Sequence, residues 1–318
     1  MTVDKFLKRI TSPDIDLNHC EDAQQVASRL HAYTNGITSD PLTVLAVVFS
    51  AMIHDCNHKG ISNAQLIKED RYLGKKYHNK SVAEQNSVDL AWELLMAPDF
   101  GELRQVMFAT PEDMLRFRQV VVNVVLATDI FDKELNQLRK NRWTKVFSED
   151  TPNNDKTKNG KATIVLEHII QASDVGHTMQ HWHIYRKWNE RLFEEMYSAY
   201  KAGRMSKDPS TFWVEGELGF FDNYVIPLAK KLDECGVFGV SSDECLINAT
   251  NNRKEWAAKG PKVVEEMTEK FSSMADDTSL GAFDDPIILR ESSFRGLMPK
   301  SIPEQPIEEF ENEVPDEP

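Results

Sequence analysis

PLTVLAVVFSAMIHD, residues 41–55, is an apolar run that ends in a histidine and an aspartate, His54 and Asp55. Asp40 precedes the run as an N-cap residue and Pro41 takes the first helical position, so the run predicts a helix that begins there. Because the run is almost wholly apolar until its end, we expect this helix to be buried. The sequence therefore predicts a central buried helix that presents His54 and Asp55 at its C-terminal end.

Helical signals continue on both sides of this central run. Ser81 and Glu84 form a capping-box pattern at the start of residues 81–96, and apolar residues follow at helical spacing. Further helices are predicted from Thr110 through residue 130 and over residues 162–175, 178–203, 211–232 and 242–258, with loops at 148–162 and 234–244. No strand pattern of period two and no internal repeat appears. The predicted fold class is therefore all-α, a compact multi-helix domain around the central buried helix.

The composition of the 318-residue chain excludes several functional classes. Hydrophobic residues make up 41%, enough for a sizeable core, and the formal charge of −14 argues against nucleic acid or an acidic membrane surface as a main partner. No stretch of 18 apolar residues is present, so we expect no membrane span. The four cysteines form no C-x-x-C pair and the N-terminus lacks a signal-peptide pattern, so we expect reduced thiols and a cytoplasmic location.

His54 and Asp55 are candidate metal ligands. Histidine offers a nitrogen and aspartate offers two oxygens, so the pair can bind metal ions and Asp55 can bridge two of them. Two ions held in this way generate a hydroxide nucleophile and clamp a phosphate. A second acid, Asp174, follows the apolar helical run IVLEHIIQAS at residues 164–173. The alternative is a His54 that only interacts with the dipole at its helix C-terminus, and the dipeptide alone leaves both interpretations open.

Several motifs follow one another along the chain. The first is His54-Asp55-x-x-His58-x-Gly60-x-x-Asn63. The others are Ser81-Val82-x-Glu84, Val125-Leu126-Ala127-Thr128-Asp129, Ala172-Ser173-Asp174, Tyr185-Arg186-x-Trp188, and Gly219-Phe220-Phe221-Asp222 with Pro227-Leu228. In this order they resemble the motifs of the class I 3′,5′-cyclic-nucleotide phosphodiesterases. The resemblance covers residues 18–260 and implies an HD-type phosphodiesterase domain.

The resemblance implies a cyclic nucleotide as the substrate and a site for two divalent metal ions, Zn²⁺ and Mg²⁺ (or Mn²⁺). His54, Asp55 and Asp174 would be the protein ligands, with Asp55 touching both ions. His58 and Glu84 would orient these ligands and their waters.

The resemblance also implies a purine clamp. Phe220 would stack on the base, and Leu192 would form the opposite wall. The family has a glutamine three residues before the phenylalanine, and Glu217 stands there in this chain. An ionised carboxylate only accepts hydrogen bonds and guanine offers two adjacent donors, so Glu217 favours cyclic GMP. Two alternatives stay open: a protonated Glu217 that acts like the glutamine, and a Glu217 that turns to solvent or to a nearby lysine.

The first histidine motif of the family, H-N-x-x-H, is altered here. The aligned stretch is Asn18-His19-Cys20-Glu21-Asp22, so the histidine that donates a proton falls on Asn18 and a metal-binding histidine falls on Asp22. Asp22 can still bind a metal ion. Asn18 cannot act as a general acid. His19 is the candidate substitute, although adjacent residues on a helix point about 100° apart.

These observations divide the chain into two segments. Residues 1–262 are expected to form the catalytic domain. The helices that precede it in the family are either missing here or replaced by a divergent N-terminus, and the apolar surface left exposed favours instability, an upstream regulatory domain or a protein partner. Residues 263–318 are expected to form a C-terminal extension with a disordered tail, because residues 301–318 carry seven acids, no bases and four prolines.

The expected function is metal-dependent hydrolysis of a 3′,5′-cyclic nucleotide to the 5′-monophosphate in signal transduction. One alternative is a degenerate phosphodiesterase that binds metal or nucleotide without turnover, which the residues at positions 18 and 22 favour. Another is a different HD-type phosphohydrolase, against which the predicted purine clamp argues.

Overall fold

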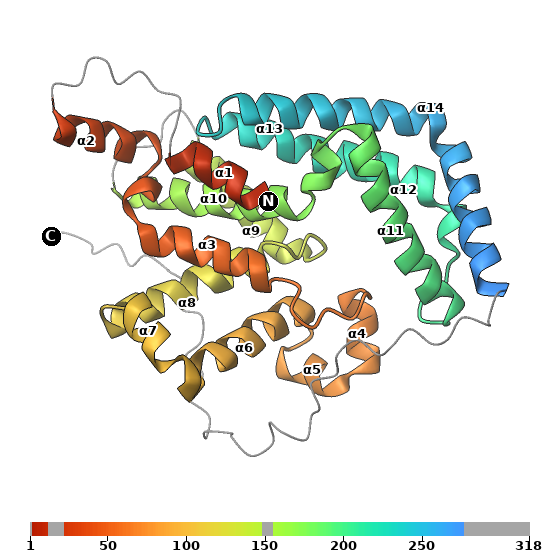
Figure 1. Cartoon of the computed structure of the whole chain (residues 1–318), viewed down its shortest axis with the longest axis horizontal. Coiled ribbons are helices and arrows are strands. Elements are labelled where there is room, and N and C mark those ends of the chain that lie inside the picture. The colour runs from red at the N-terminus through yellow and green to blue at the C-terminus, as the bar shows by residue number, and fades with distance from the viewer. Residues whose placement is uncertain (1, 12–21, 148–154, 277–318) are drawn as a thin grey trace, which may run out of the picture. The chain divides into compact units, whose positions relative to one another are not determined.

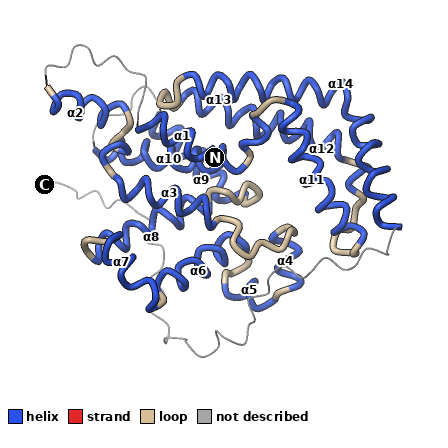
Figure 2. Tube along the Cα trace, viewed as in Figure 1, coloured by secondary structure: helices blue, strands red, loops and turns tan. Residues whose placement is uncertain are grey.

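The computed structural model describes residues 2–11, 22–147 and 155–276 (Figure 1). Helices are the only regular elements in these ranges, so the predicted all-α fold is confirmed (Figure 2). None of the helices in the described ranges combines the length and the apolar character needed to cross a membrane. The cytoplasmic location stays a prediction.

The helices follow one another with short connections. The α-helices are α1 (Thr2–Thr11), α2 (Ala23–Tyr33), α3 (Pro41–Ile53), α4 (Asn63–Glu69), α5 (Arg71–Lys76), α6 (Val82–Met96), α7 (Gly101–Met107), α8 (Pro111–Leu126), α9 (Lys133–Phe147), α10 (Asp155–Asp174), α11 (Trp182–Lys201), α12 (Trp213–Phe220), α13 (Ile226–Glu234) and α14 (Val240–Asp276). Single 3₁₀ turns cover Ile37–Ser39, Pro98–Phe100, Gly176–Met179 and Pro209–Thr211, and a π turn covers Phe221–Val225.

Helix α3 lies between two hydrophobic clusters. Asp40 caps it, as predicted, and its length packs along α8 on one side and against α1 and α10 on the other (Figure 1). Val47 belongs to the larger cluster, which includes residues of α10 to α14, and Ala46 and Ile53 belong to the cluster with α6 and α8. Because α3 is held from both sides, its C-terminal end is fixed next to the C-terminal end of α10.

The prediction that α3 is buried is wrong for one of its faces. Leu45, Val48 and Met52 remain 41%, 38% and 79% exposed. Residues three and four positions apart lie on the same side of a helix, so these three side chains form one continuous stripe. The apolar side chains of α3 therefore extend farther around the helix than the two hydrophobic clusters cover.

The N-terminal helix α1 was not among the predicted elements. Val3, Phe6 and Leu7 are buried in the larger cluster, and the Phe6 ring meets the Phe238 ring edge-on at 5.2 Å between centroids. Their spacing of three and four residues is the amphipathic helical signal by which this helix could be recognised.

The predicted helix over residues 211–232 is interrupted. Helix α12 ends at Phe220, a π turn follows, and α13 begins at Ile226. Pro227 has no N–H to donate to the preceding turn, and such a missing donor breaks the regular hydrogen-bond ladder. The predicted helix over residues 178–203 also begins later, at Trp182, after a 3₁₀ turn.

Two predicted loops are partly helical. Helix α10 begins at Asp155, inside the predicted loop 148–162, and α14 begins at Val240 and continues to Asp276 instead of stopping at residue 258. Helix α14 passes through Pro261 and changes direction along its course (Figure 1). Val263 and Phe271, beyond the proline, are buried in the larger cluster, and this packing keeps the last turns helical.

The predicted domain boundary after residue 262 falls inside α14. The compact unit to which the hydrophobic clusters belong runs from Met1 to Ser272, and a second unit covers Ser273–Pro318. Residues 277–318, which contain the predicted tail, lie outside the described residues. The two-segment division stays a proposal.

Candidate functional site

His54, Asp55 and Asp174 come together where two helices end. His54 is the C-cap residue of α3, Asp55 follows it, and Asp174 is the last residue of α10. His54 Nε2 lies 3.4 Å from Asp55 Oδ2 and 3.4 Å from Asp174 Oδ1, and one ligand atom of each residue lies within 4.8 Å of the other two. Within the described ranges, no other histidines, cysteines or acids group together in a way that could hold a metal ion.

The orientation of His54 suits metal binding. Its Nδ1 donates to the backbone oxygen of Ala51 at 3.1 Å, which leaves the lone pair of the neutral ring on Nε2. The hydrogen bond to Asp174 raises the pKa of His54 to about 9, with a further contribution from the charge of Asp55, although burial opposes it. A metal cation at this site would replace the proton that His54 Nε2 carries in the protonated ring. One imidazole nitrogen and two carboxylates are donors that Zn²⁺, Mg²⁺ and Mn²⁺ all accept, so the three residues fit a divalent metal ion.

Glu84 is held by an asparagine. Asn63 Nδ2 donates to Glu84 Oε2 at 2.9 Å. It also donates to Asp129 Oδ2 at 3.4 Å. Burial raises the pKa of Glu84, whereas the hydrogen bond from Asn63 and the charge of His58 lower it. A carboxyl group with a raised pKa is closer to the range in which it can transfer protons at neutral pH.

The start of α6 differs from the predicted capping box. Ser81 has a left-handed conformation, with φ of 38°, and its side chain caps no N–H of α6. Its hydroxyl donates to Asp129 Oδ2 at 2.8 Å instead. Asn63 Oδ1 accepts the Ala83 N–H at 2.8 Å, so a residue 20 positions earlier in the chain supplies the cap. This role of Asn63 has no local sequence signal.

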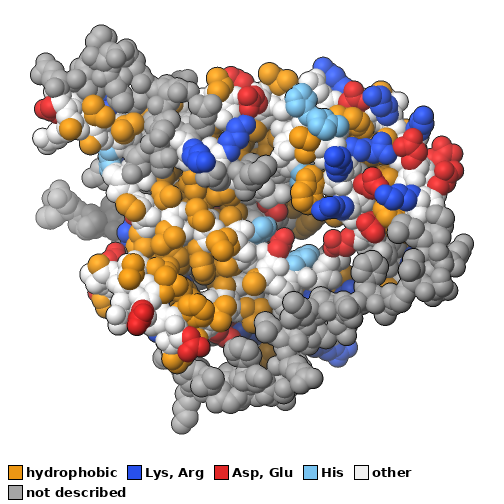
Figure 3. All heavy atoms as spheres, in the orientation of Figure 1, with side chains coloured by type: hydrophobic (Ala, Val, Ile, Leu, Met, Phe, Trp, Pro, Cys, Tyr) orange, Lys and Arg blue, Asp and Glu red, His pale blue; other side chains and the backbone are white. Residues whose placement is uncertain are grey.

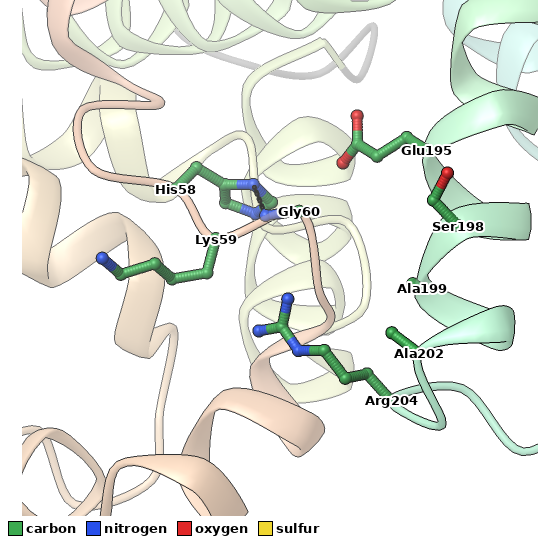
Figure 4. Close-up of a pocket in the computed structure, with 8 residues that line it drawn as sticks. All are labelled: His58, Lys59, Gly60, Glu195, Ser198, Ala199, Ala202 and Arg204. Carbon is green, nitrogen blue, oxygen red and sulfur yellow. Dashed lines mark hydrogen bonds between the residues drawn. The ribbon is translucent and has the colours of Figure 1, made fainter. Parts of the chain in front are cut away.

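His58 lines an open cavity of about 570 Å³ between the loop that follows α3 and the last turns of α11 (Figure 4). Its Nδ1 accepts the Gly60 N–H at 3.2 Å. Gly60 has a φ of +64°, a left-handed conformation that favours glycine, and a Cβ atom there would also require the flexible Glu195 side chain to move. Arg204 also lines the cavity and forms a two-pronged ion pair with Glu69.

Glu217 is buried in a polar network and does not turn to solvent or to a lysine. The Tyr185 hydroxyl donates to its Oε2, and Asn189 Nδ2 donates to its Oε1 at 2.8 Å. Tyr185 in turn accepts the Trp256 indole N–H at 2.5 Å. Burial raises the pKa of Glu217, and the two hydrogen bonds oppose that effect. Asn189 and Trp256 were not among the predicted site residues; the spacing of Asn189, four after Tyr185, places both on one face of α11.

The two predicted clamp residues lie on different helices. Phe220, at the end of α12, stacks on Tyr224 with the ring centroids 5.4 Å apart. Leu192 is 43% exposed on α11, four residues after Trp188.

Of the altered histidine motif, the structure describes only Asp22, which lies outside the group of His54, Asp55 and Asp174. Asp22 is exposed, accepts the Gln25 N–H at 2.8 Å as the N-cap of α2, and does not belong to the group that could hold a metal ion. Asn18 and His19 lie outside the described residues.

Comparison with known proteins gives matches over most of the chain. The family model of 3'5'-cyclic nucleotide phosphodiesterases matches residues 18–237. The chain is similar to the probable 3',5'-cyclic phosphodiesterase pde-3 of Caenorhabditis elegans, with 26% identity over 227 residues, which are 68% of this chain and 32% of that protein. It is also similar to the human dual specificity calcium/calmodulin-dependent 3',5'-cyclic nucleotide phosphodiesterase 1C, with 25% identity over 68% of this chain and 30% of that protein.

The matched part spans about a third of the length of these curated relatives. Among solved structures, the phosphodiesterase domain of the Salpingoeca rosetta rhodopsin phosphodiesterase matches with a TM-score of 0.59 and 19% identity, over 85% of this chain and 83% of that one. This likeness shows a shared fold.

Proposed function

This chain belongs to the 3'5'-cyclic nucleotide phosphodiesterase family, and on that premise we propose that it hydrolyses a 3′,5′-cyclic nucleotide to the 5′-monophosphate. The observation that carries the proposal is the group His54, Asp55 and Asp174, which lies inside the matched region and offers three metal ligands from two helix ends. The predicted HD-type arrangement agrees with this geometry and with the fold of the solved relative.

We propose that the site takes two divalent ions, Zn²⁺ and Mg²⁺ or Mn²⁺, whose chemistry is to lower the pKa of a bound water and to neutralise charge on the phosphate. His54 Nε2 would hold one ion, while the Nδ1–H bond to Ala51 keeps the ring from turning. The Asp55 side chain is the most exposed of the three ligands, which leaves both of its oxygens free to reach two ions. Asp174 completes the set from the opposite helix.

Glu84 and His58 are proposed to orient water at this site. Glu84 accepts from Asn63 through one oxygen, Oε2, which leaves Oε1 to accept from a water molecule. His58 stands at the rim of the 570 Å³ cavity with its Nδ1 fixed by the Gly60 N–H, so its Nε2 carries the ring proton and can donate.

The test is steady-state hydrolysis of cyclic AMP and cyclic GMP with added Zn²⁺, Mg²⁺ or Mn²⁺, together with metal analysis of the protein. Asp174→Ala is expected to lose bound metal and hydrolysis, because one of the three ligands is removed. Asp222→Ala is the control. It removes an exposed carboxylate that is paired with Arg253 and is not a member of the metal group, and it is expected to keep its metal. Metal content that does not change in Asp174→Ala would contradict the assignment.

We further propose that Glu217 selects the base. Tyr185 and Asn189 both donate to it, so the carboxylate is presented as an acceptor and keeps a second lone pair on each oxygen. The N1–H and 2-amino groups of guanine are two adjacent donors that suit this arrangement. If the pairing is fully buried, the preference for cyclic GMP is expected to be roughly 1–3 kcal/mol.

The selectivity test compares kcat/KM for the two nucleotides in the native protein and in Glu217→Gln. The ratio is expected to shift toward cyclic AMP in Glu217→Gln, because a glutamine amide can also donate. Glu215→Gln, on the exposed side of the same helix, is the matched control and is expected to leave the ratio unchanged. A native preference for cyclic AMP, or the same ratio in Glu217→Gln, would exclude the carboxylate as the selector.

A second candidate function is binding of metal or nucleotide without turnover. Asn18 stands in the position of the proton-donating histidine and cannot act as a general acid, which favours binding without turnover. General acid catalysis typically accelerates a reaction by roughly 10²–10⁴-fold. The same assay decides between the two functions: nucleotide binding with no product at any metal concentration supports the binding module. If turnover is present, loss of it in His19→Ala would identify His19 as the substitute acid.

A further inference from the structure

Helix α14 presents three side-chain donors on one face. Asn248, Asn252 and Trp256 lie four residues apart, so they share one side of the helix. Figure 3 shows Lys, Arg, Asp and Glu side chains over the surface of α11 and α14. Asn252, by contrast, is a neutral side chain that is only 1% exposed. A buried amide needs partners for its hydrogens, so the partners of Asn252 show what this face of α14 holds.

Asn252 holds the turn between α10 and α11. Its Nδ2 donates to the backbone oxygen of Thr178 at 2.8 Å and to that of Gln180 at 2.7 Å. Only the nitrogen of the amide can face two carbonyl oxygens, so the orientation of this side chain is fixed. Asn248 Nδ2 donates to the backbone oxygen of Met179 at 3.3 Å. Three successive carbonyls of the turn therefore receive donors from α14, and we call Asn248 and Asn252 the α14 clamp.

The clamp acts on a buried part of the chain. Thr178 and Met179 are both buried, and a buried backbone oxygen without a donor costs free energy comparable to a lost hydrogen bond. Trp256 donates to the Tyr185 hydroxyl in the first turns of α11. The same face of α14 therefore holds the turn and the beginning of the helix that follows it.

The turn follows directly on a proposed metal ligand. Asp174 is the last residue of α10, and the 3₁₀ turn begins two residues later, at Gly176. Thr178, whose carbonyl the clamp holds, donates its N–H and its hydroxyl to the backbone oxygen of Val175 at 2.9 and 2.6 Å. Because Val175 is the neighbour of Asp174, these hydrogen bonds run from Asn252 to the backbone that carries the Asp174 carboxylate.

We propose that Asn252, assisted by Asn248, is a positioning residue for metal binding, which fixes the turn after Asp174 and thereby the place of Asp174 beside His54. The inference rests on the metal site of the proposed function. Asn252 lies beyond residues 18–237, the region that the family model matches, so a segment outside that region supports the site. Asn252 contacts the turn and acts on the metal only through it.

Metal affinity of the folded full chain, measured by chelator competition for Zn²⁺ and for Mn²⁺, tests the proposal. Asn252→Leu keeps the branched shape of the side chain and removes both donors, so it is expected to weaken metal binding by roughly 10–100-fold. Asn248→Ala removes one longer hydrogen bond and is expected to weaken it less, and it serves as the test if Asn252→Leu does not fold. Asn251→Leu is the matched control, because Asn251 is exposed and lines the same cavity of about 320 Å³, and it is expected to bind metal like the native chain.

Two measurements separate positioning from a loss of stability. Met267→Ala removes a buried side chain of the same helix and is expected to lower the melting temperature while the folded protein keeps its metal affinity. Hydrogen exchange of the Val175, Thr178 and Gln180 amides, which bond within the turn, is expected to be faster in metal-free Asn252→Leu than in metal-free Asn251→Leu.

The outcomes distinguish this inference from the proposed function. If the native chain binds metal and folded Asn252→Leu and Asn248→Ala bind it equally well, only the role of the clamp is refuted. An equal loss of affinity in Met267→Ala, or unchanged amide exchange in Asn252→Leu, would also refute that role. A native chain that binds no metal would refute the metal site itself and, with it, the part of Asn252 in metal binding.

Discussion

At the scale of single residues, Asn63 connects three parts of the chain near the candidate site. Its amide nitrogen donates to Glu84 and contacts Asp129, and its amide oxygen accepts the Ala83 N–H in the first turn of α6. Asp129 also receives the Ser81 hydroxyl, so two carboxylates are kept apart and satisfied by neutral donors. The position of Glu84 thus depends on an amide that no neighbour in sequence could replace.

Asn63→Ala is expected to lower both stability and activity. It removes the donor to Glu84 and leaves the Ala83 N–H without its acceptor, at a cost of roughly 1–3 kcal/mol. Urea unfolding measures the stability, and kcat of the metal-loaded protein measures the effect on Glu84. Asn141→Ala, on the exposed surface of α9, is the control and is expected to change neither. An Asn63→Ala protein with native stability and native kcat would show that the network does not position Glu84.

At the scale of helices, packing decides whether a glycine can be replaced. Gly260 lies in α14, where a Cβ atom would approach a methyl group of Val214 to 2.8 Å and the ring of Trp256 to 3.1 Å. Trp256 is fully buried, so it cannot move aside without disturbing the larger cluster. Gly216 lies in α12, and there the nearest contact would be the Phe212 ring at an ordinary 3.7 Å.

These two glycines are therefore expected to respond in opposite ways to alanine. Gly260→Ala is expected to destabilise the protein by roughly 1–3 kcal/mol, because overpacking outweighs the better helix propensity of alanine. Gly216→Ala is expected to stabilise it by up to about 1 kcal/mol, since only the propensity changes. Midpoints of urea unfolding at equal m-values measure both effects. Stabilisation by Gly260→Ala would mean that α12 and α14 lie farther apart than the contacts indicate.

At the scale of the whole molecule, the described hydrophobic clusters end before the acidic tail. Val263, Val264, Met267 and Phe271 are the last buried residues of α14 in the larger cluster. Truncation after Ala282 is therefore expected to leave the melting temperature and kcat/KM unchanged. Truncation after Gly260 is the contrasting control, because it removes these four side chains and is expected to destabilise the fold by several kcal/mol. Failure of the chain ending at Ala282 to fold would show that later residues belong to the core.

Local pattern alone was enough to predict α3, its cap at Asp40 and the delivery of His54 and Asp55 at its end. Capping, helical periodicity and the exclusion of charge all act within one or two turns of the chain, so they can be read from neighbouring residues. The order of the motifs also predicted that Asp174 joins the pair, and the structure brings the three residues together.

Tertiary packing alone decided the rest. Asn63 caps α6 although it lies 20 residues earlier in the chain, and Trp256 donates a hydrogen bond to Tyr185, which lies 71 residues before it. Asp22 caps α2 and is not a member of the metal group. The prediction that α3 is buried was wrong for one face. An apolar sequence shows only that a helix favours burial, whereas the packing of all the other helices decides how much of it is covered. Hydrogen bonds and burial between distant segments exist only once the chain is folded, so no local pattern contains them.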